Sequence, residues 1–193
     1  MSVAELGARL ERLPDVLARH DLYESKGIGN EVNFHVFAYP PEAASVVEGY
    51  VPRLVQRLAD KGLQAFVFDV FQEMIAILRE SGHLEQALDL ERDKGTPALA
   101  KAVRKMLHAQ ALAARLQERR REQPHDVILI SGVGGAYPLV RAHQLLNNLH
   151  SDVEDVPLVL LYPGSYDGTA FRLFERLDDE NHYRAFVLVE QVD

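Results

Sequence analysis

The stretch from Asp126 to Leu149 constrains the fold of this chain more than any other. It begins with an uninterrupted apolar run, Val127 to Ile130, which is typical of a strand buried on both faces of a parallel sheet. Three glycines follow this run, and apolar residues recur at helical spacing beyond Pro138. The stretch therefore predicts a central strand, a glycine turn and a helix. The glycines are Gly132, Gly134 and Gly135, and the helical positions are Leu139, Ala142, Leu145, Leu146 and Leu149.

A glycine turn before a helix can hold phosphate, because backbone N–H groups can approach an anion when side chains stay out of the way. The spacing here departs from both common nucleotide motifs. A dinucleotide fingerprint starting at Gly132 needs glycine or alanine where Tyr137 stands, and a P-loop needs a lysine followed by serine or threonine. We expect a tight strand-to-helix turn. The alternative is a ligand-binding turn at Gly132, Gly134 and Gly135.

Composition limits the other possibilities. A chain of 193 residues, 47% of them hydrophobic, can bury one good core, so we expect a single α/β domain over residues 1–193. The absence of cysteine excludes disulfides, thiolate metal sites and cysteine nucleophiles. No signal-peptide pattern and no apolar run of about 18 residues occurs, so we expect a cytoplasmic protein without a membrane span. The net charge of −8 argues against broad, non-specific binding of nucleic acid.

Strand patterns alternate with helical stripes along the chain. This order predicts a layered α/β fold with a mainly parallel sheet of about five strands and helices on both faces. Extra helices precede the sheet at the N-terminus, and residues 71–122 form a helical insertion that includes one long helix from Leu99 to about Arg121. The expected strands are 34–38, with the imperfect alternation of an edge strand, then 65–70, 127–130, 157–162 and 185–189. Shorter helices are expected at 3–20, 43–58, 84–90 and 170–177.

Acidic side chains offer one candidate for catalysis or metal binding. Asp69 ends an apolar strand, where many α/β enzymes place such a group, and Glu73 lies one helical turn further on. Glu91 and Asp126 could join them, but carboxylates are plentiful in an acidic chain and no spacing singles these out. We expect Asp69 to cap the next helix instead.

Serine and histidine chemistry is also weakly supported. Neither Ser131 nor Ser165 lies in a G-x-S-x-G elbow, which argues against a serine hydrolase. His143 and His150 are seven residues apart on one helix without carboxylates at metal-ligand spacing, so we expect both at the surface. We therefore expect no catalytic residue, no metal and no cofactor.

Three arginines, Arg119, Arg120 and Arg121, close the expected long helix. Cations in a last turn complement the helix dipole, so we expect a solvated helix end. The alternative is a contact for an acidic or nucleic-acid partner. With the acidic surplus of the chain, duplex DNA should bind weakly or not at all.

Three blocks of the sequence resemble the BrxB family of BREX bacteriophage-defence systems. They are GVGGAYPLVRAHQLLNNL, VLLYPGSYDG and LFERLDDENHYRAFVL, and they lie in this order in the last third of the chain. The first 120 residues resemble the family only loosely, near Tyr39 and near Asp69. The resemblance implies a small accessory component, encoded beside a methyltransferase, a large ATPase and the alkaline-phosphatase-like protein PglZ.

The resemblance further implies a non-catalytic interaction component that binds other BREX components, with PglZ as the candidate partner, in the complex that methylates host DNA and excludes phage. It supplies no catalytic residue. Two departures concern side chains: His182 stands where a second tyrosine is expected, and Gly135–Ala136 replaces a bulkier or acidic pair. The alternative function is a degenerate nucleotide-binding α/β domain with its ligand at the 132–137 turn.

The partner-binding surface can be predicted from the order of the elements. If a helix at 170–177 joins two parallel strands, the second block follows the carboxyl end of one strand while Tyr183 and Arg184 enter the amino end of the next. Arg184 is then expected to anchor the acidic loop 178–180. Exposed aromatic and arginine side chains are the usual interface anchors. We therefore expect the partner to contact Tyr137, Arg141, Tyr166 and Asp167.

Overall fold

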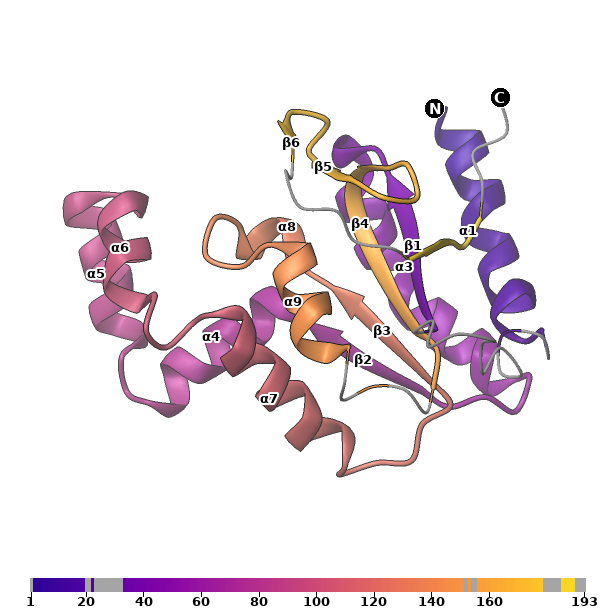
Figure 1. The fold of residues 1–193 in the computed structure, drawn as a ribbon, viewed down its shortest axis with the longest axis horizontal. Coiled ribbons are helices and arrows are strands. Elements are labelled where there is room, and N and C mark those ends of the chain that lie inside the picture. The colour runs from indigo at the N-terminus through magenta and orange to yellow at the C-terminus, as the bar shows by residue number, and fades with distance from the viewer. Residues whose placement is uncertain are drawn as a thin grey trace.

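The main sheet has parallel neighbours throughout and the order β2-β3-β4-β1-β7 (Figure 1). The computed structural model describes residues 2–19, 22, 33–150, 153, 156–178 and 185–189. Its layered α/β architecture confirms the predicted fold class. The strands of the main sheet are β1 (Phe34–Tyr39), β2 (Ala65–Asp69), β3 (Val127–Ser131), β4 (Leu158–Tyr166) and β7 (Phe186–Val187).

The first strand is an inner strand. Every residue of β1 is buried, and the strand pairs with β4 on one side and β7 on the other. The prediction of an edge strand at 34–38 was therefore wrong, because both faces of β1 are covered and alternation is lost. Among the described strands, β2 forms the other edge and leaves Val67 37% exposed.

Helices cover both faces of the sheet. On one face, α1 and α3 pack against a core that includes Phe37, Leu129 and Leu161. On the other, α4, α7, α8 and α9 pack against the alternate residues of the same strands. Within the described chain, no helix combines the length and the apolar run that a bilayer crossing requires. The helices are α1 (Val3–Leu17), the 3-10 turn η1 (Pro41–Ala43), α3 (Ala44–Ala59), α4 (Val70–Glu80), α5 (Leu84–Lys94), α6 (Thr96–Val103), α7 (Ala109–Arg120), α8 (Val133–Ala136) and α9 (Ala142–Leu149).

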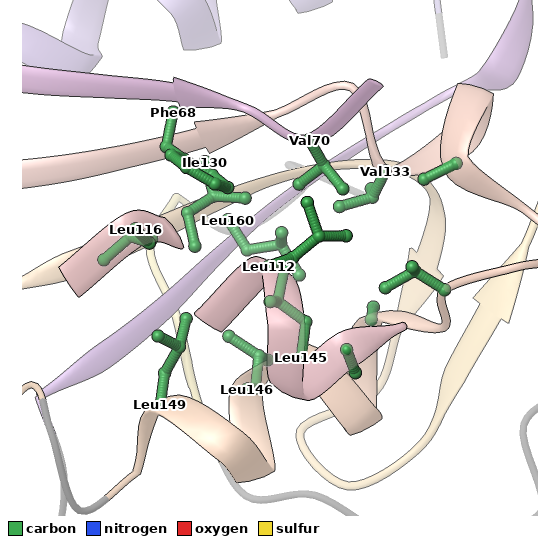
Figure 2. Close-up of a cluster of buried hydrophobic side chains, with 14 of the residues drawn as sticks. Phe68, Val70, Leu112, Leu116, Ile130, Val133, Leu145, Leu146, Leu149 and Leu160 are labelled. Atoms are coloured by element: carbon green, nitrogen blue, oxygen red, sulfur yellow. The ribbon is translucent and has the colours of Figure 1, made fainter. Parts of the chain in front are cut away.

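The larger core lies between the strands and the helices on this second face, and Figure 2 shows the part of it that α7 and α9 cover. Phe68, Ile130 and Leu160 come from β2, β3 and β4 and point toward this layer. The helical side of the cluster is aliphatic, and all of its members are fully or almost fully buried. It comprises Leu112 and Leu116 of α7 and Leu145, Leu146 and Leu149 of α9. This burial fixes α9, and with it the loop that precedes it, against the sheet.

The helices between β2 and β3 include α5 and α6, which extend beyond the end of the sheet (Figure 1, left). The predicted single helix from Leu99 to Arg121 was wrong, because α6 ends at Val103 and α7 starts at Ala109. The Nδ1 atom of His108 accepts a hydrogen bond from the N–H of Ala111 and so caps α7.

The segment after β4 is a hairpin. β4 continues through Pro163 and Gly164 to Tyr166 and pairs antiparallel with β5 (Phe171–Leu173), which pairs with β6 (Leu177–Asp178). The predicted end of this strand at Tyr162 and the predicted helix at 170–177 were therefore both wrong. A Cβ atom on Gly164 would lie 2.1 Å from the carbonyl oxygen of Arg172, so this close strand pairing requires glycine.

Candidate functional site at the carboxyl edge of the sheet

Asp69 ends β2 and caps α4, as predicted. Its Oδ1 atom accepts a hydrogen bond from the N–H of Gln72 at 2.9 Å. Its Oδ2 atom accepts one from the hydroxyl of Ser131, also at 2.9 Å. The carboxylate therefore joins the ends of β2 and β3, and it is engaged in holding the fold.

The other carboxylates proposed for a metal site are not grouped with Asp69. Glu73 accepts hydrogen bonds from Arg115 and Arg119 of α7. Asp126 accepts one from the N–H of Gln64, and Glu91 accepts one from the hydroxyl of Thr96. In the described ranges, no three His, Asp or Glu side chains come together as metal ligands would.

The glycine turn is packed against side chains from three directions. Cβ atoms built on the glycines would lie 2.3 Å from Asp69 for Gly132, and 3.0 Å from Pro163 for Gly134. For Gly135 the nearest atom, also at 3.0 Å, belongs to the ring of Phe71. Side chains thus occupy the space that a phosphate at this turn would need, which favours close packing over a ligand at the glycines themselves.

The histidines and serines discussed above have individual structural roles. His143 is buried, with 4% of its surface exposed, so the prediction that it lies at the surface was wrong, whereas His150 is exposed. His143 faces the core because it lies on the same face of α9 as the buried Leu146. The hydroxyl of Ser165 donates a hydrogen bond to the carboxylate of Glu175 and not to a histidine.

The arginine cluster at the end of α7 is partly engaged. Arg119 contacts Glu73 at 2.6 Å and Glu122 at 3.9 Å. Arg120 is buried, and its Nε atom donates to His125. Arg121 remains exposed. Arg119 and Arg120 therefore help to hold the structure. To bind an acidic partner they would first have to leave these contacts, which costs free energy and weakens them as binding residues.

Two of the predicted partner-binding residues, Tyr137 and Arg141, line one cavity of about 200 Å³. The cavity lies beside the glycine turn, between the start of α9 and the β5–β6 hairpin, which contributes Arg176 and Asp178. Its floor includes Tyr162 of β4. Sequence reasoning missed the contribution of the hairpin, because residues 170–177 were expected to form a helix.

The other two predicted residues, Tyr166 and Asp167, do not line this cavity. Tyr166 is only 9% exposed, stacks on Phe171 with ring centroids 4.4 Å apart, and both donates to and accepts from the backbone of Ala185. The expectation that Tyr166 is an exposed anchor was wrong, and burial raises the pKa of its phenol. Asp167 is exposed, and hydrogen bonds from the N–H groups of Ala170 and Thr169 lower its pKa. Tyr183 and Arg184 lie outside the described residues, as does His182.

A second hollow, an apolar groove of about 240 Å³, separates α4, α5 and α6 from the loop before α9. Phe71 and Leu88 line it with 39% and 49% of their surfaces exposed. Tyr137 lines both the groove and the cavity. The apolar pair Leu84 and Leu88, four residues apart on a highly charged helix, is a sequence signal that could have indicated this groove.

Comparisons with known proteins identify similar chains over almost the whole length. The model of the family described as BREX protein BrxB matches residues 66–188, which run from β2 to just beyond β7. The chain is 37% identical over 187 residues to BREX protein BrxB of Bacillus cereus (strain H3081.97), covering 94% of this chain and 97% of that protein. It is 30% identical over 181 residues to BREX protein BrxB of Escherichia coli O9:H4 (strain HS), covering 94% and 90%. No solved structure matches the chain significantly.

Proposed function

Because this chain belongs to the BrxB family of BREX proteins, we propose that it is a non-catalytic component of a BREX phage-defence system that binds another component. The observation that carries this proposal is the exposed apolar groove between α4, α5, α6 and the loop before α9. Exposed aromatic and aliphatic side chains that share one hollow are typical of partner-binding surfaces.

The residues around the glycine turn support a non-catalytic role. Asp69 is held by Gln72 and Ser131, and Glu73 by Arg115 and Arg119. A general acid, base or nucleophile needs freedom to reach a substrate, and these groups are instead engaged in fixing α4 to its neighbours.

The partner we propose is the alkaline-phosphatase-like protein PglZ. The groove suits an apolar helix face, because its walls come from several helices and its lining includes Phe71, Leu88 and Tyr137. In the isolated chain, Phe71 and Leu88 expose apolar surface to water, which is unfavourable. A partner side chain inserted into the groove would bury that surface.

The test is co-purification from the whole operon with this chain tagged. Leu88→Glu should reduce the recovered PglZ at least tenfold, because it places a charge in the apolar groove. Val46→Glu is the matched control, since Val46 is also 49% exposed but lies on α3, at the opposite face of the sheet. Equal recovery with both variants, at unchanged melting temperatures, would contradict the groove as the contact.

A further inference from the structure

The cavity beside the groove has chemistry that partner binding does not use. Two arginines line it from separate elements: Arg141 precedes the first turn of α9, and Arg176 lies in the turn between β5 and β6. The hydrophobic side of the wall includes Val133, Val140 and Leu173. Arg141 and Arg176 are both exposed. Apolar, low-dielectric walls focus the field of the charges that line a hollow.

The charge of the lining is opposite to that of the chain. The chain carries a net charge of −8, whereas the part of the lining that the structure describes includes two guanidinium groups and one carboxylate, Asp178. The Oδ1 atom of Asp178 lies 2.8 Å from the Nε atom of Arg172, which offsets its negative charge. Positive charge concentrated in a hollow of an acidic protein favours an anionic ligand.

The backbone beside Arg141 adds to this preference. Arg141 is the N-cap of α9, and no side chain there caps the helix. Ala142, the first residue of the helix, lines the cavity. The first N–H groups of a helix lack intrahelical acceptors and carry the positive end of its dipole, so they complement the two arginines.

We propose that this cavity binds a phosphate group. Guanidinium groups match the paired oxygens of phosphate better than any other cationic side chain. Tyr137 and Tyr162 also line the cavity. The volume of about 200 Å³ is below the roughly 300 Å³ at which pockets for drug-sized ligands begin. The ligand is therefore inorganic phosphate or a small phosphomonoester, held beside the glycine turn and not within it.

Isothermal titration of the full chain at constant ionic strength tests the site. The titrants are inorganic phosphate, adenosine monophosphate and acetate, and the variants are Arg141→Gln and Arg176→Gln. Each variant should weaken phosphate binding at least about tenfold, because each removes a charge-assisted hydrogen bond. Arg53→Gln on α3 is the control for net charge and should bind as the unmodified chain does. Circular dichroism confirms that every variant is folded.

The titrants separate the possible sources of the group. Tighter binding of adenosine monophosphate than of inorganic phosphate shows that the bound phosphate belongs to a nucleotide that extends beyond the cavity. Equal binding shows that the phosphate alone is recognised. Both outcomes support the proposal. Absence of saturable binding of both phosphate compounds overturns it, as does undiminished binding in Arg141→Gln and Arg176→Gln. Acetate binding as tightly as phosphate also overturns it, because the site would then be selective only for negative charge.

Discussion

The Oδ1 atom of Asp69 lies so close to Gly132 that a Cβ atom on Gly132 would be 2.3 Å away from it. Gly132 also has a φ of +73°, a left-handed conformation that side chains disfavour. Asp69 ends β2, and Gly132 directly follows β3, the parallel neighbour of β2. The hydroxyl of Ser131, the last residue of β3, donates to the carboxylate of Asp69. Glycine is therefore required at this point for both steric and conformational reasons.

Gly132→Ala should lower the free energy of unfolding by about 3 kcal/mol, from left-handed strain and from overlap with Asp69. Urea denaturation measures the loss. Gly82→Ala is the matched control, because Gly82 has the same φ of +73° and no atom within 4 Å of the added Cβ. It should cost only about 1 kcal/mol, from conformation alone. Equal losses in the two variants would refute the role of Asp69.

His35 should make the protein less stable in mild acid. Its side chain is 8% exposed, and burial lowers its pKa from 6.5 to about 4. The unfolded chain therefore binds a proton between pH 6.5 and 4 that the folded chain does not. The contribution is complete above pH 6.5 and is lost as the pH falls toward 4, by up to about 3 kcal/mol.

The measurement is urea unfolding of the unmodified chain and of His35→Phe over this pH range. The phenylalanine ring keeps an aromatic contact with Phe186 but cannot bind a proton. The slope of the free energy of unfolding against pH should be smaller in the variant, by the equivalent of up to one bound proton. If the slope is the same in both proteins, the folded chain protonates His35 as readily as the unfolded chain does, and burial does not lower the pKa of His35.

Glu73 should contribute measurably to the attachment of α4 to α7. Its side chain is 13% exposed and accepts from both Arg115 and Arg119. Glu73→Ala should cost about 2 kcal/mol, between the values for buried and exposed ion pairs. Asp89→Ala removes the Arg92 pair, whose side chains are both more than half exposed, and should cost less than about 0.5 kcal/mol. Thermal and urea unfolding would show the difference, and similar costs would count against the attachment.

Tyr166 should act through stability. Tyr166→Ala removes a ring buried against Phe171 and should cost about 3 kcal/mol or more. Tyr166→Phe keeps the ring and loses the two hydrogen bonds to Ala185, so it should cost about 1–2 kcal/mol. An unchanged melting temperature in Tyr166→Ala, together with loss of partner co-purification, would restore Tyr166 to the partner-binding surface.

Duplex DNA should bind the isolated chain weakly and without sequence preference. The net charge is −8, and Arg119 and Arg120 are engaged with Glu73 and His125. Fluorescence anisotropy at physiological salt should give a Kd of about 100 µM or weaker, at the weak end of non-specific binding. Submicromolar binding would show a basic surface that the chain's composition does not indicate.

The parallel core could be predicted from the sequence, because its signals are local and strong. The first four residues of β3 and of β4 are continuously apolar. Asp69 ends β2, at the position where α4 needs a cap. These patterns depend only on burial and on backbone hydrogen bonding. They fixed the fold class, the main strands and the role of Asp69.

The β5–β6 hairpin could not be predicted in the same way. Phe171, Phe174 and Leu177 are spaced as on a helix, while β5 has only three residues, too few to show alternation. Its turn uses Phe174 and Glu175 at positive φ, which sequence does not indicate for such residues. The sequence therefore did not indicate that Arg141 and Arg176 line the same cavity.

The break between α6 and α7 was hidden for a related reason. Apolar positions continue at helical spacing on both sides of the break, and the residue that caps α7 is His108. Histidine is not among the preferred N-cap residues. The apolar groove follows from this break, because α6 can then lie beside α5, away from the sheet.

Tyr137 is a shared wall, with the cavity on one side and the groove on the other. A molecule that favours one position of this ring in the cavity also sets the shape that the groove offers. Thermodynamic linkage makes such an effect reciprocal: if an occupant of the cavity changes the affinity of the groove by some factor, an occupant of the groove changes the affinity of the cavity by the same factor. One side chain would then make two separate equilibria into a single coupled one.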